Sequence, residues 1–247
     1  MPDARFQRRH YDELVRTKRR TLGCGLSCGY RDRYDPTLLD RRPALRRAWS
    51  KLLDDLLPEP AGALLDVGCG TAYYWPLLAE RCERLVGVDL SPAMVRDGQR
   101  HRLESAATAG GGSLLGADGG ALPLADAAFD VVLAVDALHH AADLDLLLAE
   151  IRRVLAPAGR LLAVEPNVVN PVVFVAHLVP PEERGALWPN HPLAVRRALG
   201  RHFDQVRAEP VTYVSGLDSE PALKLVETVD PLLRVPPLSV LALRRIW

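Results

Sequence analysis

The chain has 247 residues, of which 48% are apolar, so it can bury a sizeable core in one large domain or two small ones. Charged residues make up 25% and the formal net charge is zero, so the overall charge gives no reason to expect a polyanionic partner. No apolar run approaches the roughly 18 residues of a membrane-spanning helix, and the N-terminus lacks a signal-like apolar stretch. We therefore expect a cytoplasmic protein without a transmembrane segment.

Basic residues are concentrated near the N-terminus. Residues 1–51 contain 14 Arg and Lys against 6 Asp and Glu. This excess would suit an RNA-facing or membrane-facing arm, but a solvated basic helical face explains it more simply. We expect residues 1–58 to form an N-terminal helical cap. Cys24 and Cys28 have the spacing of a metal pair, yet no third ligand follows them, so no metal site is predicted.

Short apolar runs alternate with longer helical segments from residue 60 onward, which is typical of βαβ units. The first strand is expected at 63–67 and the first helix at 74–81. A second strand follows at 84–89. Its helix begins near Pro92, because Ser91 is a good N-cap and proline is tolerated in the first turn.

Three more strands complete the parallel part of the predicted sheet. They are expected at 110–118, at 129–136 and in a segment ending near Glu165, with a helix at 143–155 before the last of them. Five strands connected in this way predict a doubly wound α/β sheet.

The regular alternation ends after Glu165. We treat residues 166–190 as an insertion, because its apolar run is interrupted by Asn170 and Pro171. A helix at 191–202, a strand within 205–215 and a last strand within 238–247 follow. These segments predict seven strands in all, with an antiparallel strand at the end of the chain.

The loop "DVGCGTA" follows the first strand. Gly68 and Gly70 allow a tight turn close to a ligand at the start of a helix. The dinucleotide fingerprint needs a third glycine where this chain has Tyr73, and Asp66 before the loop would repel a pyrophosphate. A nicotinamide-dependent oxidoreductase is therefore the less favoured alternative.

Acidic residues end three consecutive strands of the predicted sheet. Asp66 could reach an amino acid's ammonium group, Asp89 could accept both hydroxyls of a ribose, and Asp118 could accept from an adenine amine. In open α/β sheets ligands bind at these strand ends. The three acids together fit a ligand that has an adenosyl group and an amino acid but no phosphate. S-adenosylmethionine is such a ligand.

Residues 60–165 resemble class I S-adenosylmethionine-dependent methyltransferases, and are similar to the ubiquinone and menaquinone type that acts on small molecules. "LLDVGCGTA", "LVGVDLSPAMV", "GADGGALPLADAAFDVVLAVDALHH" and "EIRRVLAPAGRLLAVEPN" follow the family's order and spacing. The resemblance implies a Rossmann-like sheet. The chain departs from the family at Ala72, where a third glycine is usual, and we expect no loss of binding from this small residue.

The family's cofactor contacts carry over to matching positions as what the resemblance implies. The methionine end would be lined by Asp66, Gly68, Gly70 and the backbone near Val135 and Asp136. The ribose and adenine would be bound by the remaining set, which is Asp89, Leu90, Met94, Asp118 and Gly119.

The acceptor is expected to be a hydrophobic small molecule, such as a quinone, polyketide, terpenoid or lipid-like intermediate, methylated on oxygen or carbon. The cap 1–58 and the insertion 166–190 would build its pocket, because aromatic and aliphatic side chains line such sites. Our candidate acceptor contacts are Tyr30, Tyr34, Tyr73, Tyr74, Trp75 and Phe174. Either His139 or His140 is the candidate general base, although "LHH" could equally be a structural turn.

Other functions remain open at this point. The end of the fourth strand lacks the Asp- or Asn-Pro-Pro-aromatic motif expected of nucleic-acid amino-methylases that grip a flipped base, which argues against DNA. An RNA methylase using the basic N-terminus is a weaker alternative. A non-catalytic cofactor-binding or assembly protein of the same fold is another, and a homodimer is a further possibility.

Overall fold

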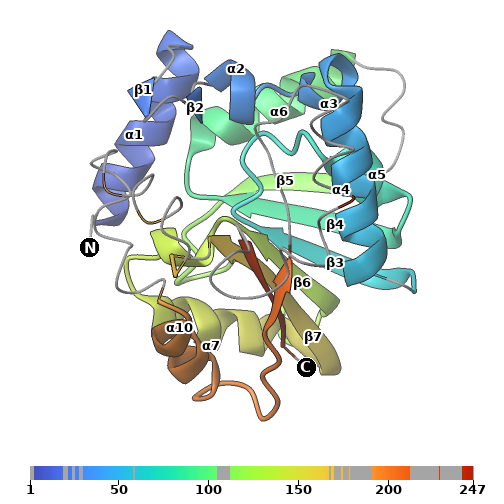
Figure 1. Ribbon diagram of the computed structural model, residues 1–247, viewed down its shortest axis with the longest axis vertical. Coiled ribbons are helices and arrows are strands. Elements are labelled where there is room, and N and C mark those ends of the chain that lie inside the picture. The colour runs from blue at the N-terminus through green and yellow to red at the C-terminus, as the bar shows by residue number, and fades with distance from the viewer. Residues whose placement is uncertain are drawn as a thin grey trace.

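The structure is a computed structural model (Figure 1). It describes residues 3–18, 22–23, 26–27, 30–57, 59–104, 112–166, 168–169, 174, 178, 191–211, 228 and 241–246. The predicted insertion 166–190 and both cysteines of the N-terminal pair therefore lie largely or wholly outside the described residues.

Helices and strands alternate through the central part of the chain. The N-terminal elements are α1 (Ala4–Thr17), β1 (Leu22–Gly23), β2 (Leu26–Ser27), α2 (Tyr30–Arg33), α3 (Leu38–Arg41) and α4 (Pro43–Leu56). The central elements are β3 (Ala61–Val67), α5 (Trp75–Ala79), β4 (Cys82–Asp89), α6 (Pro92–Glu104), β5 (Gly112–Gly116), β6 (Phe129–Val135), η1 (Leu138–His140), α7 (Leu144–Val154) and β7 (Leu155–Pro166). The last ones are α10 (Pro192–Leu199), β8 (Glu209–Val211) and β9 (Leu241–Ile246).

The main sheet has the strand order β5-β4-β3-β6-β7-β9-β8. The strands from β5 to β7 are parallel, which confirms the prediction of a doubly wound α/β sheet with five parallel strands. Strand β3, which comes first in the sequence among the strands of this sheet, lies between β4 and β6, so the connections cross over at β3. The carboxyl ends of β3, β4 and β6 therefore meet at a topological switch point, where open α/β sheets bind ligands. At the other edge, β9 pairs antiparallel with β7 and with β8.

Helices cover both faces of the sheet (Figure 1). Successive residues of β3 point to opposite faces of the sheet. Leu64 packs with the helices α4 and α5 on one face, whereas Leu65 packs with α7 and α10 on the other. Both leucines are fully buried. A continuous apolar run such as "ALL" therefore suits this strand, because both its faces are covered by helices.

Aromatic side chains fill the layer beneath α4 and α5. The Trp49 and Tyr74 rings stack with centroids 4.3 Å apart. The Trp75 indole lies against Gly87 of β4 and Gly112 of β5, where any Cβ atom would overlap it. Two strand glycines thus make room for one large core residue.

Helix α1 runs along the upper left edge of the molecule in Figure 1 and packs against α6. Asp3 caps its N-terminus by accepting from the Phe6 amide at 2.7 Å. Asp12, further along α1, accepts from the Ser91 hydroxyl at 2.7 Å and from the Ala93 amide at 3.2 Å. The N-terminal helix therefore caps the helix that follows β4.

Candidate functional site

The glycine loop after β3 has the backbone conformation that its sequence requires. Gly68 and Gly70 have positive φ angles of 76° and 54°. At Gly68 an added Cβ would lie only 2.6 Å from the Cβ of Ala137 in the loop after β6. At Gly70 a Cβ would meet only the Tyr34 ring, at 3.9 Å. Gly68 is thus needed for close packing, whereas the positive φ is what favours glycine at position 70.

Ala72 also has a positive φ, of 59°, and is buried. An alanine pays a steric cost in this left-handed region that a glycine does not. This conformation gives a physical reason for the glycine that the family usually has at this position.

Asp89 links the end of β4 to the glycine loop. Its Oδ2 accepts from the Gly70 amide at 2.8 Å and its Oδ1 from the Ser91 amide at 2.8 Å. Burial raises the pKa of Asp89, the two backbone hydrogen bonds lower it, and the charge of Asp12 raises it. The carboxylate is therefore held in one orientation at the switch point of the sheet.

Asp66 is fully buried and lies behind the loop. Its carboxylate accepts from the Tyr74 hydroxyl at 2.8 and 2.9 Å and from Nε1 of Trp75 at 2.7 Å. Burial raises its pKa to about 7, against the lowering effect of the Trp75 and Tyr74 hydrogen bonds. Asp66 thus positions the aromatic start of α5, and direct contact with the cofactor stays a prediction.

A chain of polar contacts joins β7, the loop after β6 and α1. Oε1 of Glu165 accepts from the amides of Ala137 at 3.1 Å and Leu138 at 2.7 Å, and its Oε2 lies 2.6 Å from Nδ1 of His139. The rings of His139 and His140 are 3.9 Å apart. Nε2 of His140 lies 3.1 Å from the Tyr11 hydroxyl of α1.

Asp136 precedes these histidines and has a positive φ of 56°. Its amide donates to the carbonyl of Val164 at 2.8 Å. Aspartate tolerates this conformation better than most residues, but it remains strained. The backbone thus turns sharply where β6 ends, next to the predicted contact Val135.

The other predicted cofactor contacts lie at the ends of β4 and β5. Leu90 directly follows Asp89 and is half-buried, whereas Met94 is buried with Leu14 and Tyr30 between α1 and α6. Asp118 is exposed, and its Oδ1 accepts from the Gly120 amide at 2.9 Å. At Gly119 a Cβ would lie 2.7 Å from Leu147, so the backbone there passes close to α7.

The predicted acceptor contacts at the start of α5 lie in the core. Tyr74 and Trp75 are buried, and their polar atoms bind Asp66. Their assignment to the acceptor pocket stays a prediction. Tyr73 is half-buried against Trp49, with ring centroids 5.8 Å apart, and its role stays a prediction.

The remaining predicted acceptor contacts are placed differently from one another. Tyr30 is fully buried and its hydroxyl donates to Asp97 of α6, so it is a core residue, and its assignment to the pocket stays a prediction. Tyr34 lies against Gly70 and makes an edge-on contact with Tyr11, 5.9 Å between centroids, so it stands beside the loop. Phe174 is 40% exposed, within the insertion.

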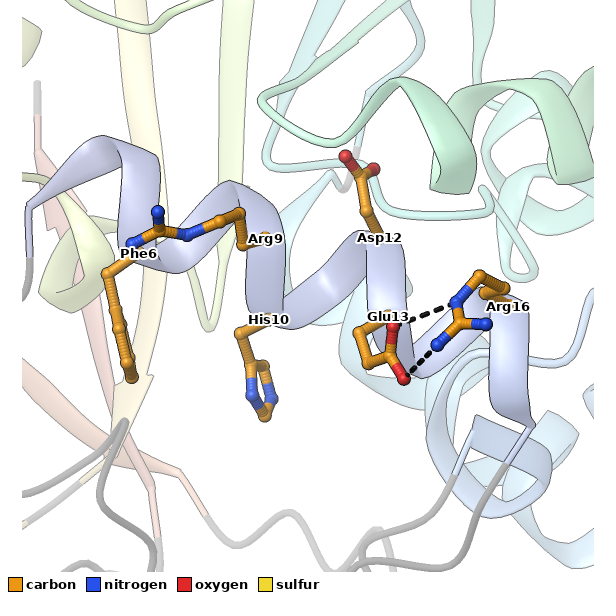
Figure 2. A pocket seen from close by; sticks show the side chains of 6 residues that line it. All are labelled: Phe6, Arg9, His10, Asp12, Glu13 and Arg16. Atoms are coloured by element: carbon orange, nitrogen blue, oxygen red, sulfur yellow. Dashed lines mark hydrogen bonds and ion pairs between the residues drawn. The ribbon is translucent and has the colours of Figure 1, made fainter.

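A surface hollow of about 640 Å³ runs along one side of α1 (Figure 2). The phenyl of Phe6 and the imidazole of His10 point the same way in this view, and Glu13 forms an ion pair with Arg16, 2.6 Å apart. The residues that line the hollow are Phe6, Arg9, His10, Asp12, Glu13 and Arg16.

Within the described ranges no group of three or more His, Cys, Asp or Glu residues forms a metal site. No described helix is long and apolar enough to cross a membrane.

Sequence reasoning missed Tyr11, Asp12 and Glu165 as parts of this site. The sequence places Glu165 at the end of a strand. An acidic residue at the end of an otherwise apolar strand was the signal that could have identified it as part of the site. Tyr11 lies 129 residues from His140 in the sequence, and Asp12 lies 79 residues from Ser91. No local pattern could have paired them.

Residues 65–163 match a protein family whose description is "Methyltransferase domain". The match begins in β3 and ends in β7, so it covers the glycine loop, Asp89, Asp118 and both histidines. Residues 65–163 are a class I S-adenosylmethionine-dependent methyltransferase domain. This confirms the resemblance seen in the sequence, and with it the cofactor expected of such a domain.

Curated relatives resemble this methyltransferase domain over about half of the chain. A malonyl-[acyl-carrier protein] O-methyltransferase of Serratia marcescens is 37% identical over 124 residues, covering 50% of this chain and 46% of the relative. A demethylmenaquinone methyltransferase of Beutenbergia cavernae is 34% identical over 134 residues, covering 54% and 53%. The chain thus spans about half the length of these relatives.

Solved structures share the fold over more of the chain. A methyltransferase of Thermotoga maritima, described as a possible histamine N-methyltransferase, aligns with a TM-score of 0.61 at 17% identity. The alignment covers 88% of this chain and 95% of that one. At this identity the likeness shows the fold of the methyltransferase domain and its surrounding elements, and nothing of the substrate.

Proposed function

We propose that the protein transfers a methyl group from S-adenosylmethionine to an oxygen or carbon atom of a hydrophobic small molecule. The observation that carries the proposal is the Asp89 carboxylate, held by the Gly70 and Ser91 amides where the parallel strands cross over. A carboxylate there suits ribose hydroxyls and repels phosphate. The glycine backbone at Gly70, which has a positive φ of 54°, suits close approach of the rest of the molecule.

The same geometry supports a set of cofactor contacts. Asp89 would hold the ribose, Leu90 and Met94 would pack near the adenine, and Asp118 with the Gly119 amide would bind the adenine edge. The glycine loop and the backbone at Val135 and Asp136 would face the methionine end. When bound, S-adenosylmethionine supplies an electrophilic methyl group on a sulfonium, and the protein's part is to orient the acceptor in line and exclude water.

We assign the general base to His139 for an acceptor that must lose a proton. Glu165 accepts at Nδ1 of His139, which keeps the proton on that nitrogen and leaves Nε2 to take one from an acceptor hydroxyl. With its proton on His139, the acceptor oxygen would be the nucleophile for the methyl group that bound S-adenosylmethionine would supply, and S-adenosylhomocysteine would be the other product. His140, in contact with Tyr11, would position α1 over the reacting groups.

The acceptor class follows from the relatives and from the covering elements. The two relatives above are named for an O-methyltransferase and for a methyltransferase of demethylmenaquinone, so both oxygen and carbon remain candidates. We assign the acceptor pocket to the N-terminal cap 1–58 with the insertion 166–190, and Tyr34 and Tyr73 are its best-supported aromatic contacts. We also infer the family's seven-stranded sheet with an antiparallel last strand, which the pairing of β9 with β7 supports.

Calorimetry with S-adenosylhomocysteine tests the cofactor half of this proposal. The wild-type protein should bind it, and NADH should not compete. Release of S-adenosylhomocysteine in the presence of demethylmenaquinone or a malonyl thioester tests the transfer half. Binding without transfer to either acceptor or to a panel of phenols would favour a non-catalytic protein, and salt-dependent binding of RNA would favour an RNA methylase.

A further inference from the structure

Gln7 on α1 is a buried polar residue that the proposed mechanism does not use. Its side chain is 2% exposed. Neither its amide oxygen nor its amide nitrogen has a hydrogen-bond partner within the part of the chain that the structure describes. Buried amides in folded proteins almost always have hydrogen-bond partners, so this side chain has the properties of a group that binds a ligand.

The helical repeat shows which way Gln7 faces. Residues 7, 11 and 14 lie on one face of α1, because positions four and seven apart are aligned on a helix. Tyr11 on this face contacts His140, and Leu14 packs with Met94. Gln7 therefore lies one turn before Tyr11, on the face directed at the histidines after β6.

The flank of the same helix borders open space. Phe6 precedes Gln7, His10 follows it by one turn, and both line the hollow beside α1 (Figure 2). Gln7 itself does not line this hollow, and its buried amide lies on the face of α1 that carries Tyr11, the residue in contact with His140.

We propose that Gln7 determines acceptor specificity by hydrogen bonding to a hydroxyl or carbonyl oxygen of the acceptor. This inference rests on the proposed methyltransferase function. The amide offers two donors on Nε2 and an acceptor on Oε1, so it can satisfy a phenolic hydroxyl in either direction. A site with a buried polar group rejects an analogue without the matching oxygen far more strongly than an apolar pocket does.

The test compares two aromatic probes of similar shape, 2-naphthol and 2-methylnaphthalene, by fluorescence titration with saturating S-adenosylhomocysteine. Wild-type protein should prefer the hydroxyl compound by roughly tenfold or more. Gln7→Met keeps the length and volume of the side chain but removes both polar atoms, so the preference should fall to about threefold or less. Arg5→Met, on the exposed face of α1, is the matched control and should keep the full preference.

Three results would overturn the proposal. The first is a wild-type protein that shows no preference for the hydroxyl compound, and the second is a Gln7→Met protein with an unchanged preference. The third is a Gln7→Met protein that loses affinity for S-adenosylhomocysteine itself, because the amide would then bind the cofactor. Failure of the wild type to bind S-adenosylhomocysteine would instead refute the proposed function. If Gln7→Met does not fold, Gln7→Asn retracts the amide by one methylene, and a retained tenfold preference there would equally count against Gln7.

Discussion

His139 and Glu165 form a buried pair, with Nδ1 of the imidazole 2.6 Å from Oε2 of the carboxylate. Both side chains are almost fully buried. The other carboxylate oxygen holds two backbone amides of the loop after β6. One residue on β7 therefore fixes both the loop and the ring that the loop carries.

Replacing Glu165 should separate these two roles. Glu165→Gln retains an oxygen for the loop amides but removes the negative charge beside His139, so the rate of methyl transfer should fall by about 100-fold while the protein stays folded. Glu165→Ala leaves two buried amides and one imidazole nitrogen without an acceptor, and should lower the free energy of unfolding by about 2–4 kcal/mol. Turnover assays and urea unfolding measure the two effects. A Glu165→Gln enzyme with full activity would show that the pair is structural alone.

Asp89 should be needed for cofactor affinity. Asp89→Ala removes the carboxylate that binds the Gly70 and Ser91 amides, and we expect the affinity for S-adenosylhomocysteine to fall by at least about tenfold. Calorimetry gives the dissociation constant. Asp126→Ala removes an exposed carboxylate paired with Arg153 and should leave this affinity unchanged. Equal affinity in wild type and Asp89→Ala would refute the assigned site.

Ala72→Gly should stabilise the protein. Ala72 has a φ of 59°, where glycine lacks the steric cost of a Cβ, so we expect the free energy of unfolding to rise by about 0.5–1 kcal/mol. Ala149→Gly is the matched control on the exposed side of α7 and should lose about 1 kcal/mol, because glycine is a poor helix former. Urea unfolding of both variants checks the prediction, which a loss of stability in Ala72→Gly would contradict.

The raised pKa of Asp66 makes stability depend on pH. Burial raises the pKa from 3.8 to about 7 in the folded protein, so between these values the folded state keeps a proton that the unfolded chain has lost. The free energy of unfolding should therefore fall as pH rises from about 4 to about 7 and then level off, with a contribution of at most about 4 kcal/mol.

Asp66→Asn isolates this contribution, since asparagine still accepts a hydrogen bond from Tyr74 or Trp75 and does not titrate. Urea unfolding of both proteins between pH 5 and pH 8 should give a difference in stability that changes steadily up to about pH 7. Parallel pH profiles for the two proteins would show that Asp66 does not titrate in this range.

The sequence predicted the parts of the site that are local. Gly68, Gly70, Asp89 and the five parallel strands follow from runs and turns of a few residues, which the hydrophobic pattern and turn chemistry specify directly. The sequence did not show that Tyr74 and Trp75 are buried, because an aromatic residue after a glycine loop suits a pocket and a core equally well. The pairs Asp12–Ser91 and Tyr11–His140 depend on how α1 packs, and tertiary packing leaves no short-range signal.

The contact of Trp75 with two strand glycines constrains how relatives of this protein can differ. Gly87 and Gly112 lie on neighbouring strands, and the indole occupies the space that their side chains would need. A relative with alanine or a larger residue at either glycine should therefore carry a smaller side chain in place of Trp75. The three positions are expected to covary as a set, although they are separated by 12 and 25 residues along the chain.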